Sequence, residues 1–108
     1  MTDVCAVLIT APDAEWLASF VRGLVDDRLC AAGHISPGRS FYRWEGEVHD
    51  ASEALATLRT VPERVSEIMD RTRREHPYKV PSIITMPIND ASPAYRAWII
   101  EQSNPLPS

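Results

Sequence analysis

Alternating hydrophobic and polar positions divide the chain into short strands and longer amphipathic helices. Residues 4–10, VCAVLIT, are apolar on both alternating faces, which predicts a strand that is covered on both sides. Pro12 is expected to open a helix in which Leu17, Val21 and Leu24 recur at helical spacing. The chain therefore begins with a buried strand followed by a helix with one apolar face.

The middle of the chain predicts strands separated by two interruptions. Residues 30–36 predict a short strand, and the Pro-Gly-Arg sequence at 37–39 predicts a turn. Residues 41–50 then predict the two arms of a hairpin. After a brief break, residues 53–60 alternate as a sheet strand should.

Two more helices and one strand complete the predicted order. Thr60 and Glu63 have the spacing of a capping box, and the helix that they open should stop before Pro77. Residues 80–88 predict the fourth strand, and Ser92 is expected to cap a last helix. The order is typical of an α+β, ferredoxin-like βαββαβ domain with an extra C-terminal helix.

The fourth strand is unusual because it contains prolines. Pro81 and Pro87 cannot donate hydrogen bonds to a sheet, so this strand should lie at a sheet edge. Two helices on one face would leave the other face of the sheet uncovered, although the first and last strands are apolar on both faces. Because buried aliphatic side chains stabilise a fold, we expect another copy of the chain to cover that face.

Composition narrows the class of protein. The chain has 108 residues, 44% hydrophobic and 24% charged, which predicts one domain over 1–108 with an ordered core at about 4–102. A net charge of −4 argues against nucleic acid or an anionic membrane as partner. The sequence shows no membrane-spanning segment and no signal-peptide pattern, so we expect a cytoplasmic protein with Cys5 and Cys30 as reduced thiols.

Several functions common on this fold are not supported by the residues. The two strands expected at the centre of the sheet carry no aromatic residue for stacking RNA bases. The first turn carries acids, where an acylphosphatase-like enzyme would need an arginine. Because no nucleophile lies in an activation motif, we expect no enzymatic activity.

Three long motifs carry a resemblance to a known family. They are FYRWEGEV at 41–48, HPYKVPSIITMPI at 76–88 and NDASPAYRAWI at 89–99. With their surroundings at 4–102, they resemble the CutA family of divalent-cation tolerance proteins. The resemblance implies a role in the response to metal ions. It also implies a tight homotrimer of PII-like architecture, in which the sheets pack inward and strand edges pair between subunits.

The resemblance also implies candidate copper ligands, and this chain departs from them. Family members often carry cysteine where this chain has Ala11 and Ala32, and an acidic residue where it has Lys79. Copper favours thiolate, imidazole and carboxylate ligands. Of these candidates only His76 remains for Cu²⁺ or another divalent cation, so weak or absent copper binding is expected.

The candidate ligand or interface residues are Tyr42, Arg43, Trp44, Tyr78 and Lys79. The hairpin residues among them have the composition of a subunit interface. One alternative is a PII-like sensor that binds a small anion between subunits through Arg43 and Lys79. Another is a structural scaffold that docks a different protein on its outer helices.

Overall fold

The computed structural model describes residues 3–105 and contains one sheet and three helices. The elements in chain order are β1 (Cys5–Ala11), α1 (Ala14–Asp26), β2 (Ala32–Trp44), β3 (Glu47–Thr60), α2 (Pro62–Glu75), β4 (Ile83–Pro87) and α3 (Pro93–Gln102). The predicted domain, 1–108, includes residues 1–2 and 106–108, which lie outside the described part.

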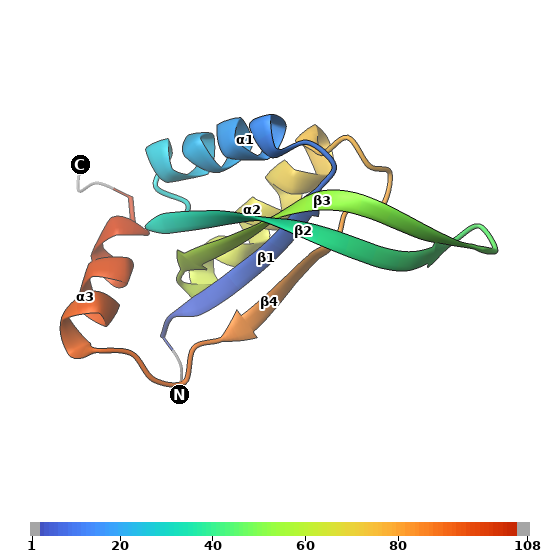
Figure 1. Cartoon of the computed structure of the whole chain (residues 1–108). Helices are drawn as coiled ribbons and strands as arrows, with labels where there is room; N and C mark the ends of the chain where they lie inside the picture. The colour runs from blue at the N-terminus through green and yellow to red at the C-terminus, as the bar shows by residue number, and fades with distance from the viewer. Residues whose placement is uncertain (1–2, 106–108) are drawn as a thin grey trace.

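The four strands form an antiparallel sheet in the order β2-β3-β1-β4. Helices α1 and α2 contribute to the same hydrophobic core on one face of the sheet, and α3 lies at one end (Figure 1). The predicted α+β class and βαββαβ order with a terminal helix are therefore confirmed. The PII-like trimer stays a prediction at this point.

Strict alternation along the two central strands builds the core. Alternate residues of β1 from Cys5 to Ala11 are buried against the helices, and β3 alternates in the same way from Ala54 to Thr60. The helices supply the large side chains that meet them, which include Leu17, Phe20, Val21, Leu24 and Ile68.

Helix α1 begins later than predicted, because Asp13 rather than Pro12 determines its start. The Asp13 carboxylate accepts a hydrogen bond from the backbone N–H of Glu15 at 3.0 Å, which caps the first turn. The helix also buries Phe20, which the predicted apolar face omitted, while Ala18 is exposed.

The predicted turn at 37–39 and the break before residue 53 are both wrong. Strand β2 runs through Pro37 and Gly38 without interruption, and β3 is continuous beside it. Proline is tolerated there because β2 is an edge strand that pairs with β3 alone. The chain reverses at Glu45 and Gly46, which both have positive φ, so β2 and β3 form a long arm that extends beyond the sheet (Figure 1).

The two predicted side-chain caps do not form. The Thr60 hydroxyl donates to the carbonyl of Leu29 at 2.7 Å, and Val61 occupies the N-cap position of α2. Ser92 occupies the N-cap position of α3, but its side chain makes no capping hydrogen bond. The end of α2 was predicted correctly, since the helix stops at Glu75, before Pro77.

Strand β4 lies at the other edge of the sheet, as its prolines predicted. It pairs with β1 only from Ile83 to Pro87, so the predicted range of 80–88 was too long. Pro81 precedes the strand and Pro87 ends it. The prolines therefore limit the length of an edge ladder.

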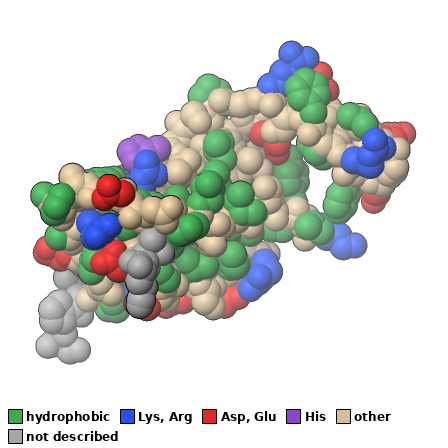
Figure 2. Space-filling model, turned by 90° about the horizontal axis from the view of Figure 1, so that it is seen from below, with side chains coloured by type: hydrophobic (Ala, Val, Ile, Leu, Met, Phe, Trp, Pro, Cys, Tyr) green, Lys and Arg blue, Asp and Glu red, His purple; other side chains and the backbone are tan. Residues whose placement is uncertain are grey.

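The sheet face opposite α1 and α2 is apolar and uncovered in the single chain. Ile84 lies opposite Leu8 in the register of β4 and β1, and Met86 lies opposite Ala6. Ile84 is 55% exposed and Met86 is 50% exposed. Figure 2 shows hydrophobic side chains gathered over the middle of one face of the molecule, between charged groups toward its ends. We use the name open face for the apolar layer formed by Ala6, Leu8, Ile84 and Met86 together with Leu55 of β3.

Candidate functional site

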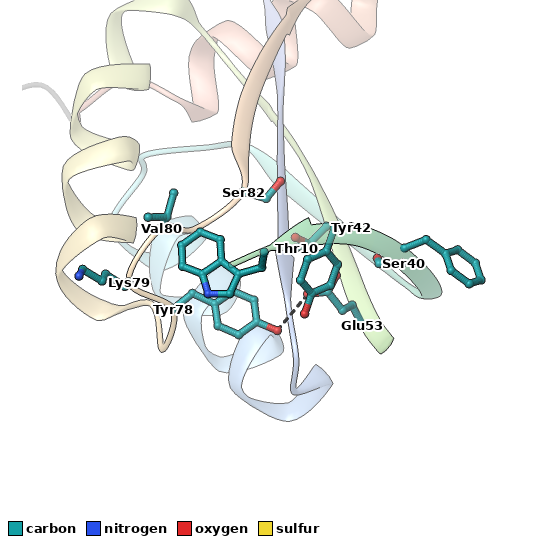
Figure 3. Close-up of a pocket in the computed structure, with 10 residues that line it drawn as sticks. Thr10, Ser40, Tyr42, Glu53, Tyr78, Lys79, Val80 and Ser82 are labelled. Carbon is teal, nitrogen blue, oxygen red and sulfur yellow. Dashed lines mark hydrogen bonds between the residues drawn. The ribbon is translucent and has the colours of Figure 1, made fainter. Parts of the chain in front are cut away.

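A cavity of about 510 Å³ lies where the arm meets the sheet. Strands β1, β2 and β3 form part of its wall, and the loop between α2 and β4 closes the other side. The lining residues are Thr10, Ser40, Phe41, Tyr42, Trp44, Glu53, Tyr78, Lys79, Val80 and Ser82 (Figure 3). The wall is thus rich in aromatic side chains and contains two charged groups.

His76 fixes the loop that closes this pocket. The backbone N–H of Tyr78 donates to His76 Nδ1 at 3.0 Å, so Nε2 carries the proton and donates to the carbonyl of Thr10 at 2.7 Å. The imidazole is buried, and the Trp16 ring lies 5.2 Å from it in an edge arrangement. Both ring nitrogens are therefore occupied, and a metal ion could bind His76 only by displacing one of these hydrogen bonds.

Tyr78 and Glu53 form the polar centre of the pocket. The Tyr78 hydroxyl donates to Glu53 Oε2 at 3.1 Å. Burial, followed by the nearby Glu53 carboxylate, raises the pKa of Tyr78 to about 12. The phenol therefore stays protonated near neutral pH and keeps its hydrogen bond to the carboxylate.

Tyr42 completes this centre from the arm. Its ring stacks on the His49 ring at 5.3 Å, and its proximity contributes to the raised pKa of Tyr78. In Figure 3, Tyr42 and Glu53 lie next to the Tyr78 hydroxyl, whereas the Lys79 side chain extends away from them. The charge that points into the pocket is therefore negative.

The structure brings most of the candidate residues together. Tyr42, Trp44, Tyr78 and Lys79 all line the pocket. Arg43 is not among the lining residues. The anion site between subunits, with Arg43 and Lys79, stays a prediction.

Sequence reasoning missed Glu53. The alternation of residues 53–60 had already placed it on the face opposite Ala54, and its partner in the register with β2 is Gly38. Only the long pairing of β3 with β2 and the position of the Tyr78 loop bring this carboxylate into an aromatic pocket.

The side chains do not fit the copper site that the family resemblance implies. Within residues 3–105, no three His, Cys, Asp or Glu side chains lie close enough together to hold a metal ion. Cys5 and Cys30 are buried free thiols, and burial raises the pKa of Cys30 to about 12. A protonated thiol is a poor metal ligand, since copper and zinc bind the thiolate.

A family model described as CutA1 divalent ion tolerance protein matches residues 5–102. The chain belongs to the CutA1 family. The resemblance found in the sequence is therefore confirmed.

Relatives in this family come from distant organisms. The divalent-cation tolerance protein CutA of Thermus thermophilus is 37% identical over 98 residues, which cover 90% of this chain and 95% of that protein. A protein CutA homolog of Danio rerio is 38% identical over 96 residues, 88% of this chain and 64% of that protein. The CutA1 proteins are named for tolerance of divalent cations rather than for catalysis.

Solved structures share the whole fold. The periplasmic divalent cation tolerance protein CutA of Archaeoglobus fulgidus superimposes with a TM-score of 0.91 at 30% identity, covering 94% of this chain and 99% of that one. The Thermus thermophilus protein gives 0.90 at 35% identity with the same coverage. Within the described residues, no helix is long and apolar enough to cross a membrane.

Proposed function

We propose that this CutA1 family member contributes to divalent-cation tolerance as a non-enzymatic, cytoplasmic homotrimer, without a copper site of the cysteine-containing kind. Its relatives are named for that tolerance. The observation that carries the proposal is the open face, where Leu8, Ile84 and Met86 form an apolar layer on one side of a sheet whose other side is fully packed.

The open face has the character of a subunit interface. Removing apolar side chains from water stabilises association by about 25 cal/mol per Å², and the open face offers several large ones on adjacent strands. It includes β4, a short edge strand whose outer hydrogen-bonding groups have no neighbouring strand within this sheet. A second copy could both cover the face and pair with that edge.

The arm supplies a second contact. Phe41 is 64% exposed and Val48 is 65% exposed on this arm. The two strands of the arm are paired along their whole length, and Arg39 and Asp50 add paired side-chain hydrogen bonds of 2.9 and 2.8 Å between them. An arm with exposed apolar side chains is suited to contacting a neighbouring subunit. The number of three copies comes from the family resemblance.

A complementation experiment tests this proposal. A host strain lacking its own family member would be grown in increasing copper, zinc and cadmium salts, with either this chain or a variant. We expect the wild type to raise the tolerated concentration of at least one metal. Ile84→Glu should fail to do so, because a carboxylate on the open face opposes assembly while the exposed position tolerates it in one chain.

The matched control is Ala18→Glu, which adds the same charge on the exposed side of α1. This variant should protect cells as well as the wild type does. If wild-type chain gives no protection at any metal concentration, the role in tolerance is wrong. If Ile84→Glu protects fully while remaining monomeric, assembly is not needed for that role.

A further inference from the structure

We infer that the pocket beside the arm binds a small organic cation, with Glu53 as its counter-ion and Tyr42, Trp44 and Tyr78 as aromatic walls. This goes beyond the proposed role in tolerance, and one chain supplies all the residues named for the pocket.

The charge inside the pocket is the first support. Glu53 and Lys79 are the two charged residues among those that line it. Figure 3 shows Glu53 beside Tyr42 and Tyr78, with Lys79 extending away from this group. A ligand in the cavity therefore meets a carboxylate, and a cation is the species that this charge attracts.

The Glu53 carboxylate is oriented by one hydrogen bond, and its other oxygen can still accept a hydrogen bond from a ligand. Tyr78 donates to its Oε2, and no hydrogen bond among residues 3–105 engages its Oε1. The Tyr78 backbone is itself held by His76 Nδ1, so the hydroxyl that orients Glu53 comes from a fixed loop. One carboxylate oxygen can thus accept a charge-assisted hydrogen bond from an ammonium group.

The aromatic walls supply the second attraction. Tyr42, Trp44 and Tyr78 line one cavity, and the faces of aromatic rings attract cations. Its volume of about 510 Å³ lies within the range of small-molecule sites. A single carboxylate among aromatic rings suits an organic ammonium better than a metal ion, which needs several oxygen, nitrogen or sulfur ligands.

Titration calorimetry with three matched probes tests this inference. Benzylammonium, benzyl alcohol and benzoate share a ring and differ in charge. We expect benzylammonium to bind about tenfold or more tightly than benzyl alcohol, with benzoate weakest of the three. Equal binding of all three, tighter binding of benzoate, or no binding of benzylammonium would overturn the assignment.

Variants locate the site. Glu53→Gln keeps an acceptor for the Tyr78 hydroxyl and should weaken benzylammonium binding about tenfold, while the matched control Glu101→Gln, on the exposed side of α3, should leave it nearly unchanged. Unchanged affinity in Glu53→Gln would contradict the inference. Circular dichroism should give the same spectrum for both variants.

Tryptophan fluorescence gives an independent readout. Trp44 lines the pocket, whereas Trp16 and Trp98 do not, so benzylammonium should change the emission of Trp98→Phe clearly and that of Trp44→Phe much less. The opposite pattern would place the probe elsewhere. The measurement uses the protein in its native assembly. If a neighbouring subunit fills the pocket, benzylammonium does not bind and this inference fails, while the proposed role in tolerance is unaffected.

Discussion

Gly33 shows how a single residue sets the distance between a helix and the sheet. A Cβ at this position of β2 would overlap Val21 Cγ1 of α1 and would lie 3.1 Å from Leu58 Cδ2. The absence of a side chain therefore lets α1 pack closely on β2. Both neighbours belong to the tightly packed core, so neither can move aside freely.

Gly33→Ala should lower the free energy of unfolding by about 1–3 kcal/mol, the usual cost of overpacking a core. Gly38→Ala, on the same strand, is the matched control, because its Cβ would meet only the Glu53 carbonyl at 3.5 Å. Urea unfolding would measure both. Equal stability of the two variants would show that α1 does not pack on β2 as described.

Cys30 gives a prediction at alkaline pH. Burial raises the pKa of its thiol from the ordinary 9.0 to about 12. The unfolded chain releases this proton at lower pH than the folded chain, so the stabilisation present below pH 9 is lost as the pH rises from 9 to 12. The unfolding midpoint in urea should fall over this range, and less steeply in Cys30→Ala. An identical slope in that variant would contradict the stated burial.

At the scale of elements, Arg28 fastens α3 to the rest of the chain. Its guanidinium donates to the carbonyls of Asn104 and Glu101 at 2.6 and 2.7 Å, and to Gln102 Oε1 at 3.3 Å. These groups belong to the C-terminal end of α3, where a positive charge suits the helix dipole. These hydrogen bonds help to hold α3 in place, since Ile99 is its one buried residue.

Arg28→Ala should therefore loosen α3 and cost about 1–3 kcal/mol of stability, since it removes hydrogen bonds from a charged donor. Arg22→Ala is the control, because Arg22 pairs with Asp26 on an exposed surface and should contribute less than about 1 kcal/mol. Hydrogen exchange of α3 amides would report the difference. Equally slow exchange in both variants would remove the role given to Arg28.

The elements also show what sequence reasoning could and could not predict. Strand and helix order followed from periodicity, because each buried face repeats at the expected spacing. The turn at 37–39 was wrong because a local proline signal cannot reveal that β2 is an edge strand paired over its whole length with β3. Thr60 was misread as a cap because its partner, Leu29, lies far away in sequence.

The candidate site shows the same contrast between local patterns, which the sequence reveals, and contacts between distant residues, which it does not. Aromatic residues on the hairpin and after His76 were found from local motifs, and they do share a pocket. Glu53 was missed because its role depends on a contact with Tyr78, 25 positions away. The positions of side chains on one strand can be predicted from alternation, whereas their partners on other elements require the fold.

At the scale of the whole molecule, the central claim is that the open face is covered by other copies of this chain. Light scattering coupled to size-exclusion chromatography tests it most directly, with wild type and Ile84→Glu compared at micromolar concentration. We expect three times the mass of one chain for the wild type and the mass of a single folded chain for the variant. A wild-type protein with the mass of one chain would contradict the account.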